Sequence, residues 1–152
     1  MKAYMKTHRG LVREQNEDTI CVAEPLYVLA DGMGGHQAGE VASALAARTL
    51  CETLRDMQPS ADALTRGYLA ANSAVFARQK EDETLSGMGT TMTALWEDQE
   101  YVFVGQIGDS RAYLYRDGKL HQITEDQSMV GEMLRAGAIT EEQARSHPYR
   151  NV

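Results

Sequence analysis

The 152-residue sequence predicts an α+β fold, because strand-like and helix-like segments are grouped along it rather than alternating. Strand-like runs occupy the first part of the chain and return after residue 90. Two long segments between them carry apolar residues at helical spacing. With 43% hydrophobic and 24% charged residues, the composition is that of a globular protein with a buried core.

The first 31 residues are expected to be mainly extended. A weak alternation of apolar and polar residues runs over 3–7, and a β-prone run covers 19–23. The continuous apolar run at 26–30 fits a strand that is buried on both faces. Later in the chain, candidate strands lie at 91–96, 101–107 and 111–115, and the Asp-Gly pair at 117–118 predicts a hairpin turn.

Four helices are expected. The two long ones cover 39–57 and 61–80, and the Pro-Ser pair at 59–60 ends the first and caps the second. A short helix is expected over 127–136, where a glycine follows, and another begins after Thr140 with the pattern of a capping box.

Charge and apolar patterning exclude several classes of partner. Asp and Glu number 22 against 15 Lys and Arg, which gives a net charge of −7 and no basic stripe of the kind that nucleic-acid binders carry. No apolar run approaches the length of about 18 residues that predicts a membrane span, and the N-terminus lacks the apolar segment of a secretory signal. We therefore expect no nucleic-acid partner, no membrane partner and a cytoplasmic location.

Cys21 and Cys51 lie 30 positions apart and show no CxxC pattern. They predict neither a disulfide framework nor a zinc site. We expect a strand position for the first and a helix position for the second, both serving as small buried hydrophobes in a reducing compartment.

The glycine-rich turn at 31–36 is the first candidate for chemistry. Its glycines fit neither a dinucleotide-binding fingerprint nor a phosphate-binding loop, and the carboxylate of Asp31 would repel a bare phosphate. A carboxylate at a strand end suits a divalent cation, which binds carboxylate and carbonyl oxygens. Gly32 would let its carbonyl approach such a cation. An ordinary strand-to-helix turn accounts for this segment equally well.

Two further polar segments contain candidate ligands. In the segment 13–18, Arg13 can bind a phosphate through two hydrogen bonds, while Glu17 and Asp18 can bind a metal. Asp109 follows a glycine between two candidate strands. Taken singly, a solvated loop and a turn explain these segments.

The ordered set of motifs is more specific than any member of it. It consists of Arg13-x-x-Asn16-Glu17-Asp18, Asp31-Gly-Met-Gly-Gly-His36, Gly89-Thr-Thr91 and Gly108-Asp-Ser-Arg-Ala-Tyr113. In this order the motifs resemble the metal-dependent serine/threonine protein phosphatases, the PPM or type 2C family. The GMGGH form of the second motif is similar to the bacterial branch.

The resemblance implies a fold, an activity and a set of metal ligands. The fold would be a four-layer α/β/β/α sandwich, and the activity would be hydrolysis of phosphoserine and phosphothreonine in proteins with Mn²⁺ or Mg²⁺. Asp31 would bridge two metals, with the Gly32 carbonyl and Glu17 completing one site and Asp18 supporting it. Asp109 matches the position implicated in a third metal of bacterial members.

The resemblance also implies catalytic roles. Two cations would generate hydroxide from a shared water, and Arg13 would hold the phosphate of the phosphorylated protein. His36 is the candidate general acid for the leaving alkoxide, because the unperturbed pKa of a histidine side chain is about 6.5. The other histidines, His8, His121 and His147, match no catalytic position.

One departure from the family concerns the end of the chain. The SDG-like and DN motifs, which supply two further metal-ligating aspartates in the family, do not occur after residue 110. Residues 1–152 therefore resemble the N-terminal portion of a phosphatase domain without its C-terminal third. Two alternatives stay open: an inactive phosphoprotein-binding module, and a nucleotide-binding α/β domain.

Overall fold

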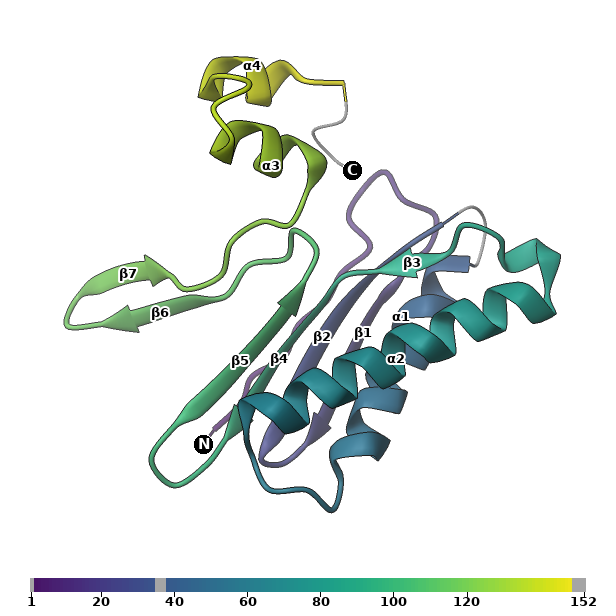
Figure 1. Ribbon diagram of the computed structural model, residues 1–152, viewed down its shortest axis with the longest axis vertical. Helices are drawn as coiled ribbons and strands as arrows, with labels where there is room; N and C mark the ends of the chain where they lie inside the picture. Colours follow the sequence, from purple (N-terminus) through teal and green to yellow (C-terminus); the bar gives the residue numbers. More distant parts are fainter. Residues whose placement is uncertain (1, 35–37, 149–152) are drawn as a thin grey trace. The chain divides into compact units, whose positions relative to one another are not determined.

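The computed structural model describes residues 2–34 and 38–148. The chain divides into two compact units, the first ending at Gln106 and the second beginning at Ile107 (Figure 1). None of the helices that the structure describes is both long and apolar enough to cross a membrane.

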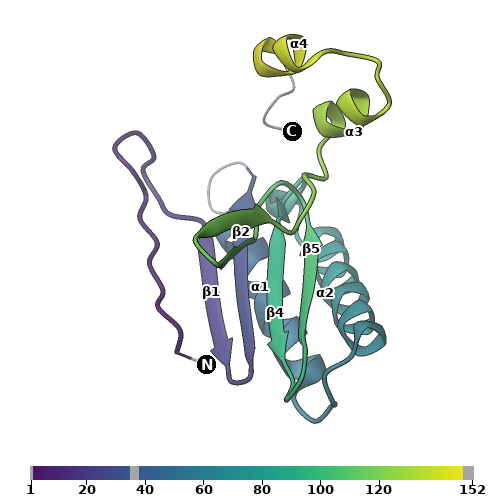
Figure 2. The same ribbon diagram turned by 90° about the vertical axis from the view of Figure 1, so that its left-hand side faces the viewer.

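The first unit is an antiparallel sheet with two helices packed on one face, as two views show (Figures 1 and 2). The strands follow the order β1-β2-β4-β5, and the short β3 also pairs with β2. The elements of this sheet and its helices are β1 Asp18–Ala23, β2 Leu26–Met33, α1 Ala38–Leu54, α2 Ala61–Glu81, the 3-10 helix η1 Glu83–Leu85, β3 Gly89–Thr90, β4 Met92–Glu97 and β5 Val102–Ile107.

Strand β2 is buried on its helix-facing side only. Leu26, Val28 and Ala30 alternate along it and are 3% exposed or less, because α1 covers them. Leu29 on the other side is 41% exposed. The prediction that this run is buried on both faces is therefore wrong, since a continuous apolar run does not reveal whether its second face is covered.

The same uncovered side of the sheet is apolar on neighbouring strands. Ile20 of β1 is the register partner of Leu29, and on the other flank of Leu29 lies the polar Thr93 of β4, which is buried. Val22 of β1 and Val102 of β5 are 38% and 48% exposed. This unit thus has one dry face against the helices and one partly exposed apolar face.

Small residues allow the helices to pack closely. Ala42, Ala46 and Ala47 of α1 are almost completely buried. In α2, a Cβ atom at Gly67 would lie 2.6 Å from Cδ1 of Leu50 in α1. The close approach of the two helices therefore depends on a missing side chain at this position.

Helix ends follow their capping signals. Helix α2 begins after Ser60, whose side chain accepts a hydrogen bond from the Ala63 N–H, as predicted. Helix α1 ends at Leu54 rather than at the predicted residue 57, because the Met57 N–H turns back to the Leu54 carbonyl oxygen in a tighter turn (3.0 Å). The predicted extended segment over 3–7 forms no strand in the described structure.

The second unit contains a hairpin and two short helices. Its elements are β6 Tyr113–Arg116, β7 Lys119–Gln122, α3 Met129–Arg135 and α4 Glu141–Ser146. Asp117 and Gly118 form the predicted hairpin turn and have φ angles of 53° and 74°, as a type I′ turn requires. The predicted capping box of α4 is also present, with Thr140 and Gln143 hydrogen-bonded to each other's backbone N–H.

An ion pair joins the segment that precedes the hairpin to the segment that precedes α3. Arg111 donates two hydrogen bonds to the Asp126 carboxylate, one of them from Nε at 2.7 Å. The Asp126 side chain is 25% exposed and that of Arg111 is 49% exposed. The hydrogen bonds from Arg111 lower the pKa of Asp126.

Replacement of Asp126 by asparagine should lower the free energy of unfolding by about 0.2–1 kcal/mol at pH 7, the range for ion pairs at the protein surface. Because the pKa of Asp126 is depressed in the folded state, its contribution is present above the unfolded pKa of about 3.9 and is lost as the pH falls through the folded value. Urea unfolding of both proteins at pH 7 and in acid should show the difference shrinking.

A control is Arg145→Gln, which breaks the Arg145–Glu141 pair, whose side chains are 82% and 79% exposed. It should change the unfolding free energy less than Asp126→Asn does. If Asp126→Asn lowers the free energy of unfolding by the same amount at neutral and at acid pH, the ionised Asp126 carboxylate is not the source of the stabilisation.

Candidate metal and phosphate site

Two aspartates lie directly opposite each other at one end of the sheet. Asp18 begins β1 and Asp31 lies near the end of β2, and the two are register partners in the antiparallel pair. Opposed Cβ atoms in such a pair are about 4.5–5.5 Å apart, and like charges in these positions destabilise the sheet. A cation bound between the two carboxylates would offset this repulsion.

Glu17 is held by its backbone beside this pair. Its carbonyl oxygen accepts a hydrogen bond from the Gly32 N–H (3.2 Å) and another from the Ser43 hydroxyl (2.6 Å). Ser43 is fully buried in α1, and its oxygen also lies 2.9 Å from the Thr19 hydroxyl. Strand β2 and helix α1 together therefore fix the position of Glu17.

Two glycines make this arrangement sterically possible. A Cβ atom at Gly32 would lie 2.0 Å from the Gly39 carbonyl oxygen, and one at Gly39 would lie 2.8 Å from Oε1 of Glu17. The first turn of α1 thus lies directly against β2, and the Glu17 carboxylate occupies the space over Gly39. A carboxylate near a helix N-terminus is favoured by the helix dipole. The reason for glycine at position 32 is therefore the contact with α1, a constraint that the sequence did not reveal.

The Gly-Thr-Thr motif fixes the backbone of Asp31. The Thr91 N–H donates to the Asp31 carbonyl oxygen (2.9 Å), and the Asp31 N–H donates to the Thr91 hydroxyl (3.1 Å). The Thr90 hydroxyl donates to the same carbonyl oxygen (3.0 Å). The motif was recognised in the sequence, but its positioning role becomes apparent only from the strand pairing.

Asp18 is oriented by hydrogen bonds to two residues of the segment that precedes β1. Its carboxylate accepts a hydrogen bond from the Thr7 hydroxyl, and the Asn16 amide donates to that hydroxyl oxygen (2.7 Å). The Asp18 N–H in turn donates to Oδ1 of Asn16 (3.1 Å). Asn16 of the first motif therefore orients Asp18.

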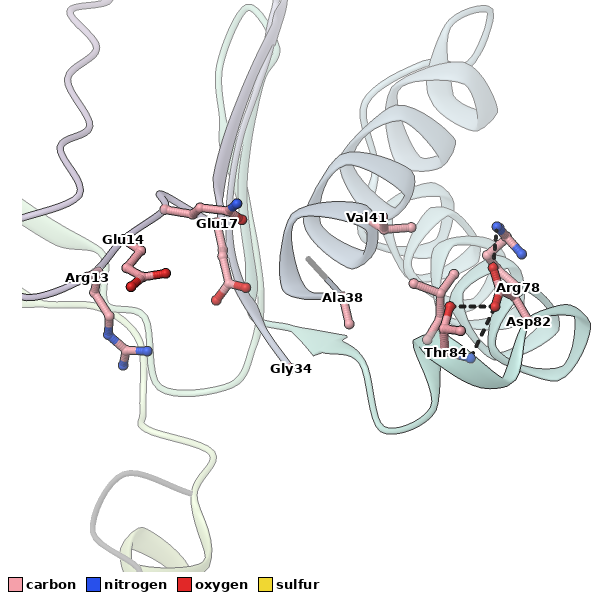
Figure 3. A pocket seen from close by; sticks show the side chains of 11 residues that line it. Arg13, Glu14, Glu17, Gly34, Ala38, Val41, Arg78, Asp82 and Thr84 are labelled. Atoms are coloured by element: carbon pink, nitrogen blue, oxygen red, sulfur yellow. Dashed lines mark hydrogen bonds and ion pairs between the residues drawn. The ribbon is translucent and has the colours of Figure 1, made fainter. Parts of the chain in front are cut away.

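Arg13 lines an open cleft of about 1050 Å³ together with Glu14 and Glu17. Figure 3 shows Arg13 and Glu14 on one side of Glu17, with Ala38 and Val41 of α1 on the other. The far wall is formed by Arg78 of α2, Thr84 and Leu85 of η1, and Asp82 between the two helices. An exposed guanidinium next to a carboxylate-bearing strand end is suited to bind a phosphate that also contacts a cation.

The carboxylate in the far wall of the cleft, that of Asp82, is hydrogen-bonded to neighbouring residues of the protein. Asp82 accepts hydrogen bonds from Arg78 (3.2 Å) and from the Thr84 N–H (3.1 Å). The hydrogen bonds from Thr84, together with that from Arg78, lower the pKa of Asp82. We therefore regard Asp82 as a cap of η1 rather than as a ligand.

The structure brings some predicted site residues together and not others. Arg13, Glu17, Asp18, Asp31 and Gly32 lie in the first unit, at one end of the sheet. Their carboxylates do not converge fully: over 2–34 and 38–148, no group of three or more His, Cys, Asp or Glu side chains is arranged to hold a metal ion.

Two predicted residues are not placed at this sheet end by the structure. His36 lies outside the described residues. Asp109 is exposed in the second unit, in a turn held by Gln127. The Gln127 N–H donates to the Gly108 carbonyl oxygen (2.9 Å), and its side-chain oxygen accepts from the Gly108 N–H (3.4 Å).

Comparison with known proteins gives a consistent picture. A sequence model of the family described as Protein phosphatase 2C matches residues 9–149. The chain is 45% identical over 150 residues to the serine/threonine protein phosphatase PstP of Mycobacterium tuberculosis, covering 97% of this chain and 29% of PstP. It is 38% identical over 163 residues to the serine/threonine phosphatase stp of Listeria monocytogenes, covering the whole chain and 65% of that relative.

Solved structures agree in fold. The crystal structure of Mycobacterium tuberculosis PstP/Ppp superimposes with a TM-score of 0.85, covering 97% of this chain and 63% of PstP, at 45% identity. The catalytic domain of PstP in complex with two manganese ions gives a TM-score of 0.81 at 44% identity, covering 91% and 61% of the two chains. The chain thus spans less than two thirds of each of these relatives.

The similarity to these structures confirms the predicted α+β fold of the phosphatase type. The family match extends over nearly the whole chain and includes all four of the motifs that suggested it. The chain therefore belongs to the protein phosphatase 2C family.

Proposed function

We propose that the protein hydrolyses phosphoserine and phosphothreonine in other proteins with the help of bound Mn²⁺ or Mg²⁺. The observation that carries this proposal is the direct opposition of Asp18 and Asp31 across β1 and β2, with the backbone of Glu17 fixed beside them. A paired-carboxylate sheet end fits hard cations, which prefer oxygen ligands. The naming of family members as serine/threonine phosphatases supports the same substrate class.

The residues of the first unit fit such cations in part. Asp31 would contact two of them, and the Gly32 carbonyl and Glu17 would complete one site, with Asp18 supporting it. When bound, such cations lower the pKa of a coordinated water, which is the chemistry that phosphate-ester hydrolysis needs. The space over Gly39 that accommodates the Glu17 carboxylate is the structural feature that supports this assignment. Asp109 is proposed as a ligand of a third ion.

Arg13 and His36 are proposed to act on the substrate itself. The guanidinium of Arg13 would donate two hydrogen bonds to the phosphate and offset its charge. His36 would donate a proton to the departing serine or threonine oxygen. Both roles rest on the motif positions, and for Arg13 also on its place at the cleft.

Residues 1–152 are proposed to form the N-terminal portion of a phosphatase domain. The coverage of 61–63% of the solved PstP chains supports this assignment. The substrates are proposed to be products of serine/threonine kinases in the cytoplasm, and the net charge of −7 disfavours a nucleic-acid partner. No finding favours the phosphoprotein-binding alternative over hydrolysis.

Asp31→Asn in the protein at its full encoded length should lower kcat by more than about 100-fold, since the carboxylate that would contact both cations loses its charge. The measurement is Mn²⁺-dependent release of phosphate from a phosphothreonine peptide, repeated at raised Mn²⁺. Asp62→Asn, an exposed position in the first turn of α2, is the matched control and should retain activity. Near-normal turnover of Asp31→Asn would overturn the site assignment.

Arg13→Ala should raise KM about 10- to 100-fold, equivalent to about 1.4–2.7 kcal/mol of binding, while Mn²⁺ affinity stays near that of the parent. The KM of Arg13→Lys should lie between those of the parent and Arg13→Ala, because lysine keeps the charge and loses the paired hydrogen bonds. Steady-state kinetics and calorimetric Mn²⁺ titration separate the effects, and Arg66→Ala on α2 serves as the control. Lost Mn²⁺ binding with an unchanged KM would contradict the role.

Gly39→Ala should weaken Mn²⁺ binding by about 10- to 100-fold, as loss of a ligand's support does, because the new methyl group would displace the Glu17 carboxylate. Gly67→Ala is a matched control, since it also adds a methyl group to a crowded helix position but touches Leu50 instead. Both should lower the melting temperature, and only Gly39→Ala should change the Mn²⁺ titration. Equal titrations for the two variants would exclude a role of Glu17 in metal binding.

A further inference from the structure

The contact between α1 and β1 contains two thiol groups that no proposed role uses. Cys21 lies on the side of β1 that faces the helices, and its register partner is the buried Val28. Cys51 lies in the last turns of α1. Their Sγ atoms are 2.8 Å apart, and both residues are free thiols.

The surrounding contacts hold the two thiols in this arrangement. Helix α1 packs on β1, and the same interface contains the contact between the Thr19 and Ser43 hydroxyls. Two elements fixed at a second point have little freedom to separate the sulfurs. Both cysteines are also partly exposed, so a small oxidant can reach them.

We propose that Cys21 and Cys51 form a reversible disulfide when the protein meets a hydroperoxide. The strand and the helix already hold the two sulfur atoms in direct contact, so bond formation does not require the two elements to approach each other first. The proposal is independent of the phosphatase activity, because it depends only on these two thiols and the oxidant. It adds a role to residues that the sequence suggested were merely small hydrophobes.

The reaction balances as a two-electron oxidation. The sulfur of Cys21 attacks one peroxide oxygen, the O–O bond breaks, and Cys21 becomes a sulfenic acid as the first water leaves. The sulfur of Cys51 then attacks the Cys21 sulfur, the S–O bond breaks, and the thiol proton of Cys51 departs with the hydroxyl group as the second water. The peroxide is reduced to two waters (or to water and an alcohol), and the two thiols are oxidised to one disulfide.

The order of the two thiols follows from their surroundings. Burial, followed by the hydrogen bond and charge interaction with Cys21, raises the pKa of Cys51 to about 12. Cys51 is therefore protonated at neutral pH and is the poorer first nucleophile, since thiolates react with peroxides. Cys21 is accordingly assigned the first attack and Cys51 the second.

The disulfide would close a loop of the chain between residues 21 and 51, which contains Asp31, Gly32 and Gly39. Such a cross-link restricts the unfolded chain, and for a loop of this length the melting temperature should rise by about 5–15 °C. Dithiothreitol should reverse the rise.

The test uses the protein at its full encoded length, treated with hydrogen peroxide, alkylated to block remaining thiols and digested with trypsin. The expected product is peptide 14–48 joined to peptide 49–55, which carry Cys21 and Cys51 respectively, and which dithiothreitol separates. Cross-linked peptide together with the reversible rise in melting temperature supports the proposal. Full alkylation of both cysteines after peroxide, or their oxidation without the joined peptide, overturns it.

Two single variants provide matched controls. Cys21→Ser and Cys51→Ser should each abolish the joined peptide and the peroxide-dependent rise in melting temperature. Because the Cys51→Ser variant lacks the thiol that would attack the oxidised Cys21, it should accumulate a sulfenic acid at Cys21, detectable with a dimedone-type reagent. The unmodified protein with and without peroxide provides the same comparison if a variant folds poorly. A rise in melting temperature that persists in both variants would show that the cause lies elsewhere.

Discussion

The close approach of helix α1 to strand β2 is the constraint on which the candidate site depends. The two backbones meet at Gly32 and Gly39, where neither residue leaves room for a side chain. The same approach brings the buried Ser43 within hydrogen-bond distance of the Glu17 carbonyl oxygen. A bulkier residue at either glycine would separate helix from sheet and release the segment that leads into Asp18. The position of the acidic residues is thus set in part by the packing of α1 against β2 at these two glycines.

The sequence located the acidic residues, and their spatial relation follows from one turn. Strands β1 and β2 are joined through Glu24 and Pro25, and residues at equal distance from this turn become partners. Asp18 and Asp31 lie at equal distance from this turn, so a tight turn at Pro25 is sufficient to predict that the two aspartates are register partners. Local turn chemistry was therefore sufficient here, and it also predicted the hairpin at Asp117 and Gly118.

Contacts between distant segments were beyond the reach of local patterns. The roles of Thr90 and Thr91 depend on the pairing of β3 with the end of β2, which no spacing rule encodes. The nearness of Cys21 and Cys51 likewise depends on how α1 crosses the sheet. The exposure of Leu29 shows the same limit, because an apolar run reports the hydrophobicity of a strand and not what covers it. Elements, their capping residues and partners within a hairpin were predictable, whereas contacts between segments distant in the sequence were not.

The hydrogen bonds from the threonines to Asp31 have a consequence for the order of folding. The hairpin of β1 and β2 is local and can form early, and it already places the two aspartates opposite each other. The hydrogen bonds that join Asp31 to Thr90 and Thr91 bridge about 60 positions of sequence, so their formation has to await closure of the long loop that contains both helices. We expect the nascent chain to present a pair of opposed carboxylates with a loose backbone, which becomes rigid only when the last central strands are added. Cations present during synthesis would then meet a flexible chelating hairpin before they meet a finished site.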